Sequence, residues 1–146
     1  MTEIKVLTAD ELHDEAFLQA IALFLFQHLG QYGDPVSHIR KSIDYALSRQ
    51  KGRGGCLVVS REAEKITGAV VINETGMEDY IPENILVYIA VDEALRGHGL
   101  GKKLMQTAID NTIGNIALHV EPENPAKKLY EKLGFTNKYL EMRLIK

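Results

Sequence analysis

This sequence of 146 residues contains only one cysteine, four prolines and no tryptophan. Cys56 alone cannot form a disulfide within the chain, so a reducing cytoplasm is the simplest compartment. We expect Cys56 to be a small apolar residue of a buried strand. The few prolines, together with 25% charged and 45% hydrophobic residues, exclude a largely disordered chain.

The sequence also lacks a strong charge of either sign and a long hydrophobic run. Seventeen basic and twenty acidic residues give a net charge of −3, which argues against nonspecific nucleic-acid binding and mildly favours a cationic small molecule or peptide. The most apolar stretch, residues 16–29, is shorter than the ~20 residues that a membrane span needs. Acidic residues at positions 10–15 stand where a secretory signal would need positive charge. We therefore expect neither a membrane span nor a targeting segment.

Hydrophobic periodicity divides the chain into alternating strands and helices. Alternation or continuous apolar character predicts strands over residues 4–8, 56–60, 66–73, 85–91, 116–121 and 139–145. Helical spacing predicts helices over residues 11–29, with Asp10 as the N-cap, and over 35–50, 100–113 and 125–133. Since the chain shows no internal repeat and no long linker, we expect residues 1–146 to form a single domain.

A glycine-rich loop follows the apolar strand over residues 85–91. Its sequence is Arg96, Gly97, His98, Gly99, Leu100, Gly101 and Lys102. Three glycines in five positions leave backbone N–H groups uncovered and permit positive φ, and the following helix adds free N-terminal amides, so the loop can hold a phosphate. A simple turn would also account for the glycines.

Two familiar phosphate motifs do not fit this loop. The P-loop pattern requires glycine where Arg96 stands, and Ser or Thr where Lys103 stands. The dinucleotide pattern that starts at Gly97 requires glycine at position 102, which is Lys102. The spacing that remains is RxxGxG.

Residues 85–135 resemble the GCN5-related N-acetyltransferase family. The resemblance is carried by Arg96, Gly99 and Gly101 after the fourth strand, and by Asn124 and Tyr130 beside a later helix; residues 1–84 match only in the order of their elements. It implies a single α/β domain whose mixed, mostly antiparallel sheet has six to seven strands, is flanked by about four helices and is splayed between strands 4 and 5. It also implies direct transfer of an acetyl group from acetyl-CoA to a primary amine of a small molecule or peptide, without a metal.

The same resemblance assigns acetyl-CoA to the fourth strand and the glycine loop. In this family the pantetheine arm pairs with the fourth strand and the loop amides hold the pyrophosphate. The implied cofactor-binding residues are Ile89, Ala90, Val91, Arg96, Gly97, His98, Gly99, Leu100, Gly101, Lys102, Asn124 and Tyr130. Asn124 is equally well placed as a helix N-cap. Arg96 and Lys102 offer charged contacts to phosphate or are solvent-exposed charges at a helix end.

Acetyl transfer needs an acid for the departing thiolate and a base for the amine. Tyr130 resembles the family's general acid, and a phenol with a reference pKa of about 10 is protonated at neutral pH. The alternative is a core tyrosine on the apolar face of its helix.

The general base is the catalytic residue at which this sequence departs from better-known members of the family. Histone-type members carry a glutamate at the start of the fourth strand, where this chain has Ile85. The fifth-strand glutamate of ribosomal-protein N-terminal acetyltransferases aligns with His119. Strand alternation places His119 and Glu121 on one face, so both are candidate bases, directly or through water. The alternative is a surface pair.

Two rival functions stay open at this stage. The missing strand-four glutamate favours a non-catalytic acyl-CoA-binding or interaction module. The likeness at His119 also allows a protein N-terminal acetyltransferase. The acceptor is not specified by any motif, and the apolar first helix and final strand are compatible with a homodimer.

Overall fold

The structure is a computed structural model that describes residues 1–48 and 50–146. Its strands are β1 (Thr2–Leu7), β2 (Gly55–Glu62), β3 (Lys65–Glu74), β4 (Asn84–Val91) and β5 (Ile116–Leu118). Its α-helices are α1 (Glu15–Leu29), α2 (Val36–Ala46), α3 (Leu100–Asp110) and α4 (Ala126–Lys132), and the 3₁₀ turns are η1 (Gly30–Tyr32) and η2 (Glu93–Leu95). The expected α/β architecture with four flanking α-helices is confirmed for the described residues.

The five strands form one mixed sheet in the order β1-β2-β3-β4-β5. The first four strands pair antiparallel, and β5 pairs parallel to β4 over only three residues, Asn84–Leu86 with Ile116–Leu118. The mostly antiparallel sheet is therefore confirmed, but the predicted six to seven strands are wrong for the part of the chain that the structure describes. Beyond Leu86 the fourth and fifth strands no longer pair, which leaves the sheet open there.

The missing strand is the one predicted over residues 139–145. That segment has no regular secondary structure, and Leu140, Met142 and Leu144 are 84 to 92% exposed. An alternating pattern produces a strand only where a neighbouring edge supplies hydrogen bonds. The strand predicted over 116–121 ends at Leu118, where its pairing with β4 also ends, at Leu86.

Besides the end of α3, which is Asp110 and not residue 113, two helix boundaries differ clearly from expectation. The N-cap of α1 is Asp14, whose side chain accepts a hydrogen bond from the Ala16 amide at 3.1 Å, so the predicted cap at Asp10 is wrong. The second helix ends at Ala46; the predicted continuation to residue 50 crosses Arg49, which lies outside the described residues. Both differences are local and leave the order of elements unchanged.

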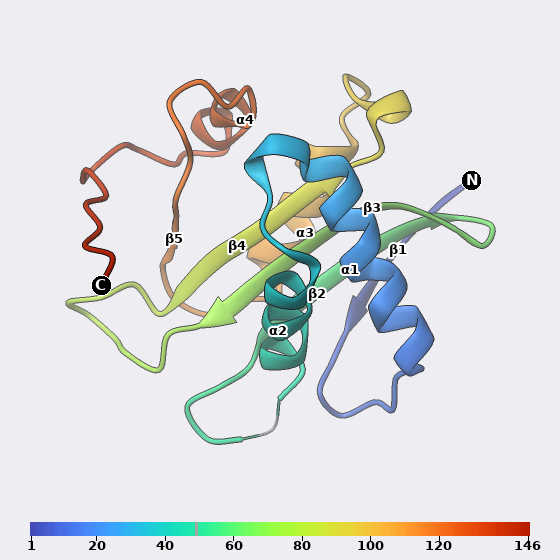
Figure 1. The fold of residues 1–146 in the computed structure, drawn as a ribbon, viewed down its shortest axis with the longest axis horizontal. Helices are drawn as coiled ribbons and strands as arrows, with labels where there is room; N and C mark the ends of the chain where they lie inside the picture. Colours follow the sequence, from blue (N-terminus) through green and yellow to red (C-terminus); the bar gives the residue numbers. More distant parts are fainter. Residues whose placement is uncertain (49) are drawn as a thin grey trace.

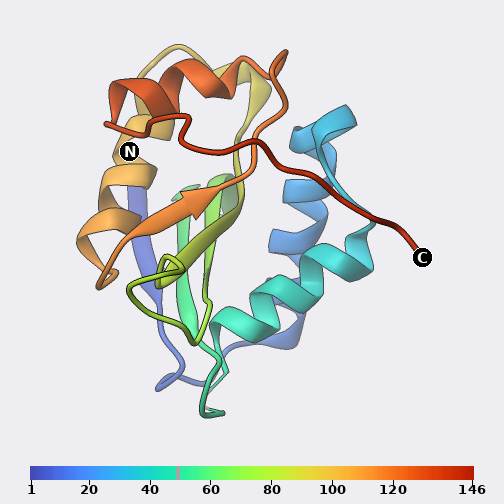
Figure 2. The same cartoon turned by 90° about the vertical axis from the view of Figure 1, so that its left-hand side faces the viewer.

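Strand alternation sends successive side chains to opposite faces of the sheet, and each face is covered by helices (Figures 1 and 2). Leu57, Val59 and Val71 pack with α1 and α2. Val58, Val70 and Ile72 pack with α3 on the other face, where α4 also lies. The strands most completely buried are β2 and β3; β4, expected to be covered on both faces, is only partly buried along its second half.

Cys56 lies in the core on the α3 face and is 3% exposed, as the sequence predicts. Burial raises the pKa of its thiol to about 11. The native protein is therefore expected to resist a thiol-specific reagent at about pH 8, because only the thiolate reacts. Addition of denaturant should release one equivalent of reactive thiol; rapid labelling of the folded protein would contradict the buried position.

Candidate active site

The second half of β4 presents free backbone groups at the opening of the sheet. The register shifts from Val71↔Tyr88 to Ile72↔Leu86, which leaves Val87 as an extra residue, a β-bulge. The extra residue of a bulge reverses the alternation of the strand, so that residues beyond it direct their N–H and C=O groups to the opposite side. The bulge at Val87 therefore decides which main-chain groups of β4 face the opening in the sheet.

Two hydrogen bonds fix the directions on either side of this bulge. Before it, the Asn84 amide donates to the Asn115 carbonyl at 3.0 Å, toward β5. After it, the Asp92 amide donates to the Thr67 carbonyl at 2.9 Å, toward β3. By alternation, the main-chain groups of Ile89 and Val91 face the side that β5 has left. Ala90, which pairs in register with Ala69, faces β3 with its main chain.

The glycine loop connects β4 to α3 and leaves its amides exposed. Gly97 and Gly99 both have φ +84°, and a Cβ on either would meet no atom within 4 Å. Gly99 is the N-cap of α3 and gives it no side-chain cap. The first amides of α3 are therefore uncovered and point into open space, with the positive end of the helix dipole behind them. This arrangement fits a phosphate or pyrophosphate group.

Of the two charged side chains of the loop, Arg96 is arranged differently from the sequence-based expectation, whereas Lys102 is exposed as expected. The Arg96 guanidinium donates to the His28 carbonyl at 2.8 Å, and the Glu93 amide donates to His28 Nδ1 at 3.4 Å. Arg96 thus ties the loop to the end of α1. Lys102 is exposed and, within residues 1–48 and 50–146, has no ion pair, so its charge is available to an anion.

Tyr130 lies on α4, beside the start of α3. A Cβ built on Gly101 would lie 3.4 Å from Leu129 Cδ2 and 3.8 Å from Val91 Cγ2, so α4 packs where β4 ends and α3 begins. Tyr130 is 7% exposed, its ring contacts Phe135 edge-on at 5.9 Å between centroids, and burial raises its pKa to about 12. Among the described residues, the Tyr130 hydroxyl has no hydrogen-bond partner. Every fully buried side-chain oxygen in that part of the chain does have a partner, so the Tyr130 oxygen is in contact with solvent. It is free to donate a proton.

A cleft of about 210 Å³ lies between the loop that joins α1 to α2 and the segment that joins β5 to α4. Three residues predicted from the sequence line it, His119, Glu121 and Asn124. Val120 lines it as well, so the strand alternation assumed for residues 119–121 does not hold beyond Leu118. Tyr130 is not among its lining residues.

The predicted second role of Asn124, as a helix N-cap, is wrong by one residue, because the N-cap of α4 is Pro125. The Asn124 side-chain oxygen still accepts a hydrogen bond at 2.9 Å from the amide of Ala126, the first residue of α4. The Tyr32 hydroxyl donates to the Glu123 carbonyl at 3.4 Å and joins the two walls of the cleft. Asn124 therefore helps to fix the wall of the cleft that carries His119 and Glu121.

The opposite wall contains a carboxylate that the sequence did not single out. Asp34 lines the cleft, and its Oδ2 accepts a hydrogen bond from the Tyr88 hydroxyl of β4 at 2.5 Å. Burial, followed by this hydrogen bond and the nearby charge, raises the pKa of Tyr88 well above its ordinary value. In the sequence, Asp34 lies just before the helix predicted from residue 35, and Tyr88 lies in the strand predicted over residues 85–91. Their contact, across 54 positions, has no local signal.

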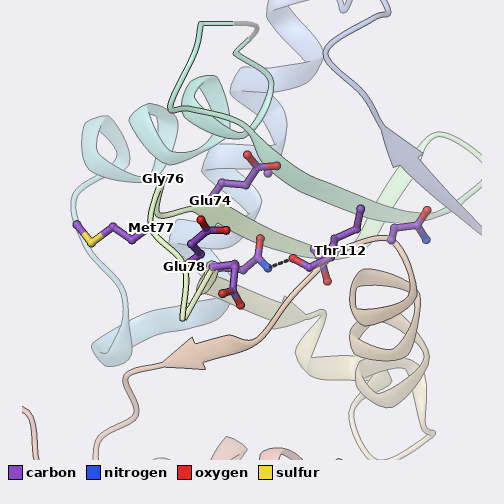
Figure 3. Close-up of a pocket in the computed structure, with 10 residues that line it drawn as sticks. Glu74, Gly76, Met77, Glu78 and Thr112 are labelled. Atoms are coloured by element: carbon purple, nitrogen blue, oxygen red, sulfur yellow. Dashed lines mark hydrogen bonds between the residues drawn. The ribbon is translucent and has the colours of Figure 1, made fainter. Parts of the chain in front are cut away.

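A second, larger cleft of about 540 Å³ lies at the other end of β4 (Figure 3). Glu74, Glu78 and Glu83 line it. The Glu83 carboxylate accepts hydrogen bonds from the amides of Asn115 at 2.7 Å and Asp79 at 3.0 Å, which lower its pKa. These acids are separated from the glycine loop by the length of β4, so they are poorly placed as bases for chemistry at the opening.

No set of three or more His, Cys, Asp or Glu side chains able to hold a metal occurs in the described part of the chain. Across the same residues, every helix is too short or too polar to cross a bilayer.

Comparison with known proteins is consistent with this geometry. A sequence profile of the family described as "Acetyltransferase (GNAT) domain" matches residues 52–137. The mycothiol acetyltransferase of Catenulispora acidiphila is 37% identical over 62 residues, which are 39% of this chain and 20% of that protein. This chain therefore spans about a fifth of the length of that curated relative.

Two solved structures share the fold. A GNAT family acetyltransferase from Streptococcus pneumoniae TIGR4 superposes with a TM-score of 0.70 at 16% identity, covering 100% of this chain and 98% of the other. An aminoglycoside N-acetyltransferase solved in complex with CoA gives a TM-score of 0.69 at 16% identity, covering 100% of this chain and 95% of the other. At this identity the likeness concerns the fold.

Proposed function

Because this chain belongs to the acetyltransferase (GNAT) domain family, a family of acyltransferases that use acetyl-CoA, we propose that residues 1–146 form one N-acetyltransferase domain that acetylates a primary amine. The acceptor is a small molecule or peptide. The observation that carries the proposal is the free edge of β4 at Ile89 and Val91, which leads directly to the uncapped amides of the glycine loop. The buried lone cysteine favours the cytoplasm as the compartment.

The donor fits along β4 and the loop. The free main-chain groups of Ile89 and Val91 are suited to the amides of the pantetheine arm, and the amides from Gly97 to Lys102 are suited to the pyrophosphate. Lys102 adds a charge-assisted contact, whereas Arg96 supports the loop from behind through His28. When bound, acetyl-CoA supplies an activated thioester carbonyl.

Tyr130 is the proposed general acid. Its hydroxyl is solvent-accessible and unpaired within the described residues, and the preceding residue, Leu129, packs α4 beside the end of β4. Because burial raises its pKa to about 12, the phenol is protonated throughout the neutral and mildly alkaline range. A neutral phenol in this position can donate to a leaving thiolate.

His119 and Glu121 are the proposed bases, and Asp34 is the proposed acceptor-binding carboxylate. All three line one cleft between the α1–α2 loop and the segment that follows β5. Among the described residues, the lining carries two carboxylates and no lysine or arginine, which favours a cationic acceptor. His119 or Glu121 can take the proton of the incoming ammonium, directly or through a water molecule.

The proposed activity is tested by thiol release from acetyl-CoA with a panel of free amines and peptides. Saturable release with a free amine is the expected result. Tight CoA binding without turnover for any acceptor would instead support the non-catalytic module. Activity restricted to peptides with a free N-terminus would support a protein N-terminal acetyltransferase.

Asp34→Asn is expected to raise KM for a cationic amine about tenfold, whereas kcat should change less than about threefold. The reason is that a carboxylate near a protein surface contributes on the order of 1–4 kcal/mol to binding a cation. Asparagine keeps an oxygen that can accept from Tyr88. Asp110→Asn, an exposed aspartate on α3, is the matched control and should leave KM unchanged. Equal KM values for wild type and Asp34→Asn would exclude Asp34 from acceptor binding.

A further inference from the structure

Two adjacent residues before and at the start of β4 hold the turn that leads into β5. Asn84 is 2% exposed, and its side-chain amide donates to the carbonyl oxygens of Ile113 at 2.8 Å (dashed line in Figure 3) and of Asn115 at 3.3 Å. The main-chain amide of Asn84 also donates to the Asn115 carbonyl, at 3.0 Å. The Glu83 carboxylate accepts from the Asn115 amide at 2.7 Å. Glu83 and Asn84 thus form a clamp that binds both main-chain groups of Asn115.

The Glu83 carboxylate is itself fixed from two sides. Its second oxygen accepts a hydrogen bond from the Asp79 amide at 3.0 Å, in the loop between β3 and β4. The turn passes so close to it that a Cβ built on Gly114 would lie 2.6 to 2.7 Å from the Glu83 side chain. Gly114 also has φ +95°, which glycine adopts without strain. The approach of the turn to Glu83 therefore requires a glycine at this position.

β5 depends on the clamp for its exact placement. It pairs with β4 over only three residues, and Ile116 and Leu118 pack against the apolar core on the α3 face. Apolar packing has no preferred direction, whereas hydrogen bonds fix distances and angles. The next residue, His119, begins the cleft wall that continues to Asn124, whose amide donates to the Glu121 carbonyl at 3.0 Å. The wall is therefore anchored at Asn124 and, through β5, at the clamp.

We propose that Glu83 and Asn84 are positioning residues, because by holding the turn before β5 the clamp sets the position of the wall that carries His119 and Glu121. Both clamp residues line the larger cleft at the other end of β4, so they act through β5. A displacement of 1 Å at a reacting group, caused by a distant substitution, can lower the rate about 100-fold. The positioning role rests on the proposed function, whereas the hold of the clamp on β5 is measurable without turnover.

Asn84→Ala is expected to lower kcat with a free amine about 10- to 100-fold. The dissociation constant of CoA should stay within about twofold of wild type, because the residues proposed to bind the donor lie at the other end of β4. Asn73→Ala is the matched control, since the Asn73 side-chain amide also donates to a carbonyl, that of Ser42 at 3.0 Å, but ties β3 to α2. This control should keep kcat within about threefold. An equal fall of kcat in both variants would overturn the positioning role.

Hydrogen exchange followed by mass spectrometry tests the clamp without any turnover. Asn84→Ala should speed exchange across residues 116–121 at least about tenfold and leave the glycine loop unchanged. Glu83→Gln is a milder second variant that replaces one accepting oxygen by an NH₂ group, and it should speed exchange in the same segment. Glu78→Gln is its control, because Glu78 is an exposed acid that lines the same cleft. Exchange in this control should match wild type.

The two measurements separate failure of this proposal from failure of the proposed function. Unchanged exchange at residues 116–121 in both clamp variants overturns the clamp. Faster exchange together with wild-type kcat overturns the positioning role. A wild-type protein that acetylates no amine overturns the proposed function instead, and the exchange data then decide by themselves whether the clamp holds β5.

Discussion

Tyr130→Phe is expected to lower kcat by about 10²–10³-fold, the range in which positioned proton donors contribute, while the dissociation constant of CoA stays within about twofold of wild type. The substitution removes one oxygen and keeps the ring against Phe135. The hydroxyl has no partner in the described part of the chain, so its removal breaks no internal hydrogen bond and the fold should be unaffected. Steady-state thiol release and calorimetric CoA titration measure the two effects.

Tyr139→Phe provides the matched control, because Tyr139 is 79% exposed on the C-terminal segment. This variant should show wild-type kcat.

The pH profile adds a second check on Tyr130. A phenol with its pKa raised to about 12 is protonated below that pH, so loss of the acid should not depress kcat between about pH 7 and 10. A Tyr130→Phe enzyme with normal kcat would mean that the proton comes from elsewhere.

Gly99→Val is expected to weaken CoA binding by about 10- to 100-fold, because an L-residue in the left-handed region costs roughly 1–2 kcal/mol and a β-branched one more. Gly99 holds φ +84° with open space around it, so the penalty arises from the backbone and not from a clash. Relaxation of that strain would turn the uncapped amides of α3 away from the phosphate. CoA titration of the folded variant measures the loss.

The chain offers a close control for this substitution. Gly52 has φ +83° and likewise no atom within 4 Å of a built Cβ, but it lies in the turn before β2. Gly52→Val should impose a similar strain on stability and leave CoA affinity unchanged. If both variants bind CoA like wild type while remaining folded, the glycine loop does not hold the donor.

Much of the candidate site could be predicted because its parts are local. The loop is recognised from glycines at alternate positions between an apolar strand and an amphipathic helix. In the structure, Gly97 and Gly99 have the positive φ that glycine permits. The hydrogen bond from the Ala126 amide to the Asn124 side chain is local in the same way, since it joins residues only two positions apart. In both cases the physical cause lies within a few residues of the sequence signal.

The errors have a common origin in pairing between distant segments. Residues 139–145 alternate as a strand should, but within the described chain they do not pair with the free outer edge of β5. The alternating pattern predicts a strand through residues 119–121, yet β5 ends at Leu118, where the pairing with β4 stops one residue before the Val87 bulge. Neither the bulge nor the absence of a partner is encoded in the local pattern.

The sequence by itself determined the glycine loop, the helix behind it and the tyrosine on α4, because backbone freedom, helix capping and hydrophobic periodicity depend on neighbouring residues. Only the tertiary structure decided that Ile89 and Val91 face an opening, that Arg96 is held by the end of α1, and that Tyr88 bonds Asp34 in the cleft beside His119. Those features depend on strand register and on contacts between side chains many positions apart. Folding brings such groups together through the packing of the whole core, which no short stretch of sequence specifies.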